Sequence, residues 1–566
     1  MTPIENILIK HIEVISSAMP ETKSLRGRSK INAGSLYGIN KIRRLILDLA
    51  LKGKLVEREE IRSHSCNSDE VIGGSKNILP GTWNYGRLGD IASLITKGTT
   101  PTSIGYAYQT SGIKFVKVEN ISEGHINLPS INQYISEEVD AALSRSRLKA
   151  NDLLFSIAGT IGRACIVRDS DLPANTNQAL AIIRGADEVF SPPFLLRQLN
   201  SFVADQIVIK ARGGAMNNVS LSDLSNAMLV IPPYDEQLKI SKKIDELMTL
   251  CDILEDKSIE ANLSHINLVK NFLSVLISSD SNKSFEDNWK NIVNSFDVLF
   301  TTPDSIQELK YSLLELALMG RLVPHKDDEE SSDQLLKQIE NEKYRLIVKG
   351  LIKKEKSLPA ITEQEKVFPL PKGWEWARLQ TVIDVRDGTH DSPKESMDAN
   401  SFPMVTSKDF SGGEINFSEA KRISAADHEE IAKRSFVEKF DILFSMIGGN
   451  IGNQVMVTTD QPFSIKNVAL FKYYNKELTN PFFIKKYSEY LASKLQSSAV
   501  GGAQPFVSLG QLRALVIALP PKQEQRRIVE KLDQLLLLCD KLENYLKEAN
   551  QLKKKIADAL VEQALA

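Results

Sequence analysis

The chain carries the same motif twice. Pro-Pro-x-x-Glu-Gln-x-x-Ile occupies residues 232–240 and returns at residues 520–528. Each copy follows an apolar run, at residues 227–231 and 515–519, and opens a long segment with apolar residues at heptad spacing. A repeated strand-to-helix junction indicates that a whole structural unit is duplicated, so the fold must be one that two similar units build together.

The duplication extends upstream of this motif at a similar offset. The matched pairs are Leu-Pro-x-x-Trp at 79–83 and 370–374, Asp-x-Leu-Phe-Ser at 152–156 and 441–445, and a helix-like segment at 47–56 and 314–323. Glycines at 53 and 320 fall where a C′ glycine ends a helix. Each unit therefore runs helix, linker, globular module, long helix.

These boundaries predict the domain organisation. A chain of 566 residues exceeds what one hydrophobic core usually supports. The predicted parts are an N-terminal helical region and linker (1–78), a first module (79–231), a central helical region and linker (232–369), a second module (370–519) and a C-terminal helix (520–566). The predicted fold class is α+β, with two mixed α/β modules joined by long helices in a pseudo-two-fold internal repeat.

The long segments after the two Pro-Pro pairs have apolar residues stepping by three and four. This spacing is typical of a coiled-coil seam, and two seams of equal length pair most simply with each other, antiparallel about the pseudo-two-fold axis. The alternative is that each helix packs only on its own module. The predicted seam residues are Ile240, Ile244, Leu247, Cys251, Leu254, Ile528, Leu532, Leu535, Cys539 and Leu542.

Composition narrows the class of protein. The formal net charge of −2 argues against a general polyanion binder, which usually carries a basic footprint. Four cysteines without a Cys-x-x-Cys spacing indicate neither a disulfide framework nor a zinc site. The sequence contains neither an apolar stretch of membrane-spanning length nor a leader pattern, so we expect a cytoplasmic protein.

Glycine-flanked turns in both modules carry hydroxyl, amide and basic side chains, which suit DNA base edges and phosphates. Apolar strand positions match between the copies, whereas turn residues differ: Arg163 corresponds to Asn453, and Thr100 to His390. One scaffold with two recognition surfaces would show this pattern, although such residues are more often solvated loop. The candidate DNA-binding residues, chosen by turn position and residue type, are Lys97, Thr99, Thr100, Lys117, Asn120, Arg163, Asn175, Asn177, Arg212, Asn217, Arg386, Thr389, His390, Lys408, Asn450, Asn453, Lys466, Asn467 and Gln504.

Motifs for catalysis are weak or absent in the sequence. Ser-Pro-Pro-Phe at 191–194 matches an adenine methyltransferase motif, but its counterpart at 480–482 breaks the pattern, and a proline opening a helix explains it better. Residues 303–310 imitate a metal-nuclease motif, yet they fall on a predicted helix. A phosphate-binding Gly-x-x-x-x-Gly-Lys loop and a His-Glu-x-x-His motif do not occur. The sequence predicts a non-catalytic chain without a metal or cofactor of its own.

Two variable modules, each followed by a strand, the Pro-Pro-x-x-Glu-Gln motif and a long helix, resemble the specificity subunit of type I restriction-modification systems. The resemblance covers essentially the whole chain. It implies that 79–231 and 370–519 are target recognition domains, each reading one half of a split double-stranded DNA site, and that the coiled coil sets the spacer. It further implies partners: two modification subunits and restriction subunits, to which S-adenosylmethionine, ATP and Mg belong.

The long segment before the first module, residues 1–77, departs from the simplest family pattern. It suggests that residues 39–56 pair with the C-terminal helix near 557–566, which would complete the circular symmetry of the repeat. Alternative functions are a coiled-coil adaptor, a two-headed DNA-binding regulator without a helix-turn-helix or basic region, and a methyltransferase with its own activity.

Overall fold

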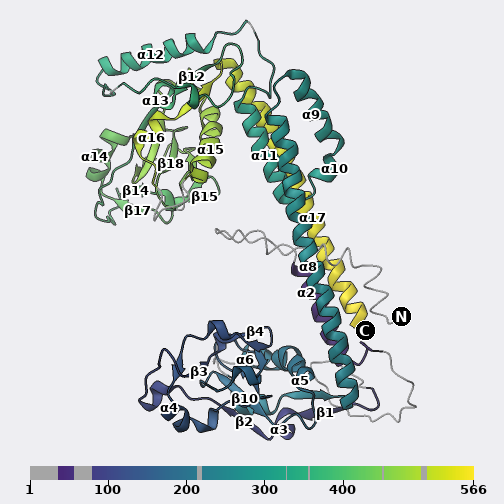
Figure 1. Cartoon of the computed structure of the whole chain (residues 1–566). Helices are drawn as coiled ribbons and strands as arrows, with labels where there is room; N and C mark the ends of the chain where they lie inside the picture. The colour runs from purple at the N-terminus through teal and green to yellow at the C-terminus, as the bar shows by residue number, and fades with distance from the viewer. Residues whose placement is uncertain are drawn as a thin grey trace. The chain divides into compact units, whose positions relative to one another are not determined.

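The computed structural model describes residues 36–56, 80–212, 219–326, 328–354, 357–448, 451–498 and 506–565. The chain forms two compact units: residues 1–263 with 548–566, and residues 264–547. Two helices contribute to both units, α8 (Tyr234–Ile277) and α17 (Lys522–Leu565) (Figure 1). Each is 44 residues long and begins directly after a Pro-Pro pair, as the heptad spacing predicts.

The first unit contains α2 (Leu36–Leu51) and the first module. A four-stranded antiparallel sheet with the order β2-β10-β7-β8 forms the centre of this module. Smaller sheets are β1-β11, β4-β5 and the mixed sheet β6-β3-β9, in which β3 and β9 run parallel. The strands are β1 (Asn84–Arg87), β2 (Leu94–Lys97), β3 (Ile113–Val116), β4 (Ile121–Ser122), β5 (His125–Ile126), β6 (Tyr134–Ile135), β7 (Leu153–Ser156), β8 (Ala164–Ile166), β9 (Ala174–Thr176), β10 (Leu180–Arg184) and β11 (Met228–Ile231), and the module helices are α3 (Leu88–Ile91), α4 (Glu137–Ala142), α5 (Pro192–Gln198), α6 (Ala204–Arg212) and α7 (Leu221–Ser225).

The second unit repeats this arrangement. Its four-stranded sheet has the order β13-β21-β18-β19, with β12-β22, β15-β16 and the mixed sheet β17-β14-β20 beside it. The strands are β12 (Glu375–Arg378), β13 (Asp384–Asp387), β14 (Phe402–Val405), β15 (Phe410–Ser411), β16 (Glu414–Ile415), β17 (Lys421–Ile423), β18 (Ile442–Ser445), β19 (Gln454–Met456), β20 (Ser464–Ile465), β21 (Val468–Lys472) and β22 (Val516–Leu519), and the helices are α9 (Asn282–Asn294), α10 (Phe296–Leu299), α11 (Pro303–Leu318), α12 (Ser332–Val348), α13 (Leu379–Val382), α14 (Ala425–Ser435), α15 (Pro481–Ser498) and α16 (Leu509–Ala514). The mixed modules and the internal repeat are confirmed.

The strand β10 shows why the modules need an uninterrupted apolar run at their centre. Ala181 and Ile183 point into the core that includes α5 and α2, whereas Leu180 and Ile182 point into a second core formed with β8 and β9. In the second module β21 separates two cores in the same alternating way. A strand covered on both faces cannot alternate apolar and polar residues.

The helices of the first unit pair as the circular repeat predicts. The Tyr37 hydroxyl of α2 donates to Asp558 of α17 over 3.0 Å, and Lys41 forms an ion pair with the same carboxylate over 2.7 Å. Further along, the Lys52 ammonium donates to the Leu565 carbonyl over 2.7 Å. The segment 39–56 therefore does lie against the C-terminal helix.

The second unit contains the corresponding pairing. Lys310 of α11 forms ion pairs of 2.6 Å with both Asp540 and Glu543 of α17. The first unit combines the start of α8 with the end of α17, and the second combines the end of α8 with the start of α17. The two long helices therefore run antiparallel.

The ten predicted seam residues all face an apolar core. Ile240, Ile244, Cys251, Ile528, Leu532 and Cys539 are buried, and Leu247, Leu254, Leu535 and Leu542 pack partly buried against the same clusters. These clusters also contain module residues, such as Val230 in the cluster that includes Ile240. The predicted pairing of the two long helices is confirmed, and the first turns of each helix pack on their own module as well.

Candidate nucleic-acid interface

The duplicated motif builds a hydrogen-bonded clamp in each unit. The indole N–H of Trp83 donates to Glu236 over 2.6 Å, and that of Trp374 donates to Glu524 over 3.1 Å. Each bond ties the residue before the first module strand to the first turn of the long helix. Both partners are repeated in the sequence, but about 150 residues separate them, so their spacing did not reveal the pairing.

The glutamine of the motif also joins the long helix to the module by hydrogen bonds. Gln237 accepts from the Ser191 N–H over 2.8 Å and donates to the Pro232 carbonyl over 3.0 Å. Gln525 makes the same two contacts with Asn480 and Pro520, at 3.0 Å each. Both glutamines are fully buried, so these bonds satisfy groups that would otherwise cost about 1–3 kcal/mol each.

The two clamps differ in electrostatics. Glu524 is buried and also contacts the imidazole Nδ1 of His325 over 2.6 Å, whereas Glu236 is half-buried. Burial raises the pKa of the Glu524 carboxyl group, and His325 and the Trp374 N–H oppose that rise. The second clamp is therefore the more costly one to leave without a partner.

In each module two turns meet at the end of the central sheet. We call this place the turn edge: residues 97–101 with 176–178 in the first module, and 387–391 with 465–467 in the second. A Cβ atom on Gly98 would lie 1.9 Å from the Thr176 carbonyl oxygen, and one on Gly388 would lie 2.5 Å from that of Ile465. Glycine is required at both positions because the two turns approach too closely for any side chain.

Side chains connect the two turns of each edge. Thr100 donates to Gln178 in the first module. In the second, the imidazole Nδ1 of His390 lies 3.0 Å from the amide oxygen of Asn467, and Lys466 donates to Ser392. The structure thus brings together the predicted residues Lys97, Thr99, Thr100 and Asn177 at one edge, and Thr389, His390, Lys466 and Asn467 at the other.

A third loop joins the first turn edge. The Ile157 N–H donates to the Ala179 carbonyl over 2.9 Å, which places the loop after β7 beside the second turn. Ser156 organises this loop, because its hydroxyl donates to the Thr160 carbonyl and accepts from the Arg163 N–H. Arg163 is exposed. The corresponding loop of the second module begins at Ser445 and carries Asn453, which is half-buried.

The remaining candidates divide into several groups. Lys117 and Lys408 lie near the start of the short helices that follow β3 and β14. Lys117 is half-buried, with its ammonium 5.0 Å from the centre of the Tyr108 ring, and Lys408 is exposed. Arg386 forms an ion pair of 2.7 Å with Asp384. Arg212 ends helix α6. Asn217, Asn450 and Gln504 lie outside the described residues.

Three further candidates are buried, and their polar atoms make hydrogen bonds within the module. Asn120 is buried; it accepts from the Lys117 N–H and donates to the Ser130 carbonyl. Asn175 has no exposed surface and donates to Asp140 and to the Leu143 carbonyl. Thr389 is buried and its hydroxyl accepts from the Asp391 N–H.

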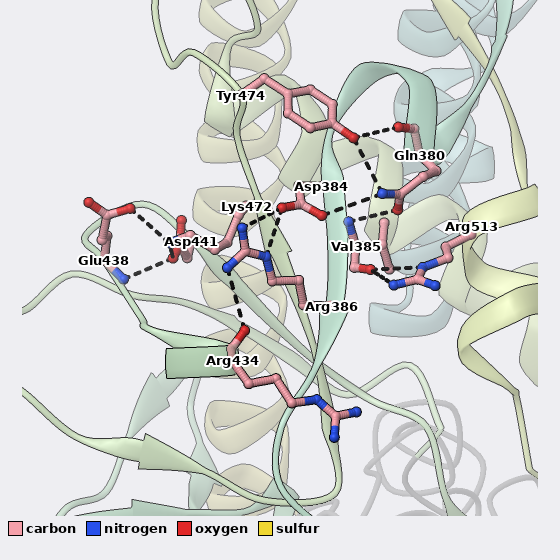
Figure 2. A network of polar contacts seen from close by, with 10 residues as sticks. All are labelled: Gln380, Asp384, Val385, Arg386, Arg434, Glu438, Asp441, Lys472, Tyr474 and Arg513. Carbon is pink, nitrogen blue, oxygen red and sulfur yellow. Dashed lines mark hydrogen bonds and ion pairs between the residues drawn. The ribbon is translucent and has the colours of Figure 1, made fainter. Parts of the chain in front are cut away.

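A buried polar network braces the second module at the other end of the same strands (Figure 2). Lys472 forms ion pairs of 2.7 Å with Glu438 and with the fully buried Asp441, and Gln380 links Tyr474 to the Val385 N–H. Burial raises the pKa of the Asp441 carboxyl group, which Lys472 counteracts. The first module has the equivalent pair Asp152 and Arg184, at 2.5 Å.

The catalytic look-alikes are structural. Lys310 of the nuclease-like segment binds two acids of α17, and Pro192 opens α5 as a helix-starting proline. Within the described part of the chain, His, Cys, Asp and Glu form no group of three or more suited to a metal ion. Among the same residues, no helix is both long and apolar enough to cross a membrane.

Comparisons with known proteins place most of the chain in one family. Residues 80–263 and 371–554 match the family model described as type I restriction modification DNA specificity domain. The chain is 27% identical to the type I restriction enzyme EcoAI specificity subunit of Escherichia coli, over 99% of this chain and 100% of that protein. Identity and coverage are the same for the EcoEI specificity subunit of Escherichia coli. A chain from a solved type I R-M system is 19% identical, covers 86% of this chain and 98% of its own length, and has a TM-score of 0.47.

Proposed function

Because this chain belongs to the family of type I restriction modification DNA specificity domains, we propose that each of its two modules reads one half of a split DNA site. The family membership makes the chain the DNA specificity subunit of a type I restriction-modification system, and the predicted resemblance is confirmed. Such a subunit is non-catalytic and binds no cofactor; the cofactors belong to the modification and restriction subunits.

The observation that carries the proposal is the pair of turn edges. Both are built by a close approach at a glycine, which follows β2 in the first module and the equivalent strand β13 in the second. Their polar side chains differ: Lys97 and Arg163 are exposed and Thr100 half-buried at the first edge, whereas His390 is exposed and Lys466 half-buried at the second. An identical scaffold with different polar tips is what two different base sequences require, because base identity is read by side-chain hydrogen bonds.

The proposed contacts supply discrimination rather than strong general affinity. A near-neutral chain releases few counterions from the phosphate backbone, so its own non-specific binding is weak. Each correctly read base pair contributes roughly 1–3 kcal/mol. The bound partners then carry out the chemistry on an adenine flipped out of the duplex.

The long helices are proposed to set the spacer between the two half-sites. A helix of 44 residues is about 66 Å long at ~1.5 Å per residue, which exceeds one turn of B-DNA at ~34 Å. The proposed partners are double-stranded DNA, two modification subunits and restriction subunits, and the proposed location is the cytoplasm. The name of the matched family and of its relatives supports these partners.

The test is a genome-wide map of N6-methyladenine in the native host, with and without this gene. We expect one split motif to lose methylation on both strands when the gene is deleted and to regain it when the gene is restored. An unchanged methylome in cells that express the modification partner would refute the proposal and favour a coiled-coil adaptor or a two-headed regulator.

A further inference from the structure

The two turn edges carry opposite charges at one equivalent position. Lys97 ends β2 and Asp387 ends β13, and each pairs across the sheet with an alanine, Ala181 or Ala469. Both precede the glycine of the close approach. A carboxylate at this place would repel phosphates and base-edge acceptors, since Asp can only accept hydrogen bonds and typically pairs with the amino group of cytosine.

Two basic side chains contact Asp387 and compensate its negative charge. Its carboxylate accepts from the guanidinium of Arg434 through one oxygen and lies 3.2 Å from the imidazole Nε2 of His390 through the other. The Asp387 side chain is only 14% exposed, whereas Arg434 is 60% and His390 62% exposed. The acid therefore lies beneath two basic side chains, which are more exposed than it is.

Helix α14 brings Arg434 to this position. The helix packs against β13 and β20, and Arg434 lies in its last turn. Arg386 donates to the main-chain carbonyl of Arg434 over 3.4 Å, as Figure 2 shows, so the end of the helix is tied to the strand that carries Asp387. Arg434 lies more than forty residues from the turn in sequence, which is why the turn pattern did not reveal it.

We propose that Asp387 is a positioning residue and that Arg434 is a specificity-determining residue of the second module, reading guanine in its half-site. This inference rests on the proposed function. A guanidinium has five N–H donors in a planar fork, so one bond to Asp387 fixes its direction and leaves donors for O6 and N7 of guanine. His390, held between Asp387 and Asn467, forms the adjoining wall of the site.

The experiment is a methylome map in host strains whose only copy of this gene carries Arg434→Ala, Arg434→Lys or Asp387→Asn. We expect both Arg434 variants to relax one G·C position of one half-site, with a loss of discrimination of about 5- to 150-fold, and the other half-site to stay unchanged. Asp387→Asn keeps the shape of the side chain but loses its charge, and we expect a smaller relaxation at the same position.

Lys433→Ala is the matched control. Lys433 is the exposed neighbour on the same helix, paired with Glu430 over 2.6 Å, and its loss is expected to leave the motif intact. If Arg434→Ala abolishes methylation altogether, Arg434→Lys, which keeps the charge without the planar fork, decides: a relaxed position supports the inference and an unchanged motif overturns it. Failure of the proposed function would appear separately, as a wild-type strain without a gene-dependent split motif.

Discussion

Alanine at Gly98 tests the close approach on which the first turn edge depends. The new Cβ atom would lie 1.9 Å from the Thr176 carbonyl oxygen, and non-bonded carbon and oxygen need about 3 Å or more, so the turns must separate by about 1 Å. Overpacking of this kind costs about 1–3 kcal/mol. Because Thr100 and Gln178 bridge the two turns, the same shift breaks their hydrogen bond.

We expect Gly98→Ala to weaken recognition of the half-site that the first module is proposed to read, which would appear as reduced methylation. We also expect it to lower the thermal unfolding midpoint of the purified chain. Gly388→Ala should affect the other half-site more mildly, since its Cβ would lie 2.5 Å from the Ile465 carbonyl and a shift of about 0.5 Å relieves the contact. The readouts are methylation mapping in the host and melting curves of the full chain.

Gly510→Ala is the control for glycine loss as such. Gly510 lies in helix α16, and a Cβ atom added there would have no neighbour closer than 3.9 Å, so alanine should stabilise the helix by about 0.5–1 kcal/mol. The reasoning is refuted if Gly98→Ala leaves both the motif and the unfolding midpoint as in wild type, or if both half-sites weaken equally.

Three further outcomes test the scaffold. Trp374→Phe should destabilise the second clamp by about 1–3 kcal/mol. Trp83→Phe should cost less, because Glu236 is half-buried and can regain water. Hydrogen exchange of the peptides around β22 and β11 measures the two costs, and equal costs would contradict this prediction. Burial raises the pKa of the Cys165 thiol to about 12, so it should resist alkylation at pH 8 until the module unfolds, and rapid labelling of the folded chain would argue against its burial. Lys310→Met removes the ion pairs that join α11 to α17 and should speed hydrogen exchange in α11. Added salt should have the same effect, to a smaller extent, in the wild-type chain. Unaltered exchange would mean that apolar contacts alone hold α11 against α17.

Local patterns predicted the parts of the fold that local physics decides. The heptad spacing after each Pro-Pro pair located α8 and α17, and the glycines at 53 and 320 do adopt positive φ at the helix ends. The repeat located both modules because duplicated strands keep their apolar positions. These features depend on neighbours in sequence, which is why one sequence sufficed.

The candidate site was predicted less well because burial of a polar side chain depends on distant partners. Asn175 looked like a turn amide, but parallel pairing of β9 with β3 buries it, and Asp140 on another element accepts its hydrogen bond. The contact between Arg434 and Asp387 has no signal in the sequence, because helix α14 carries no motif and only its packing on β13 brings Arg434 to Asp387.

Positions that are similar in the two modules and positions that differ lie at opposite ends of the central strands. At one end of β21, Lys472 forms a buried ion pair with Asp441, which directly precedes β18, and the first module repeats this pair as Arg184 and Asp152. At the other end, Asp387 stands where the first module has Lys97. A buried charge without its partner costs about 3–5 kcal/mol, so the braced end cannot change one residue at a time. An exposed edge residue such as Lys97 costs within about 0.5 kcal/mol to replace, so the exposed positions of the edge can acquire new side chains while the brace keeps the sheet in register.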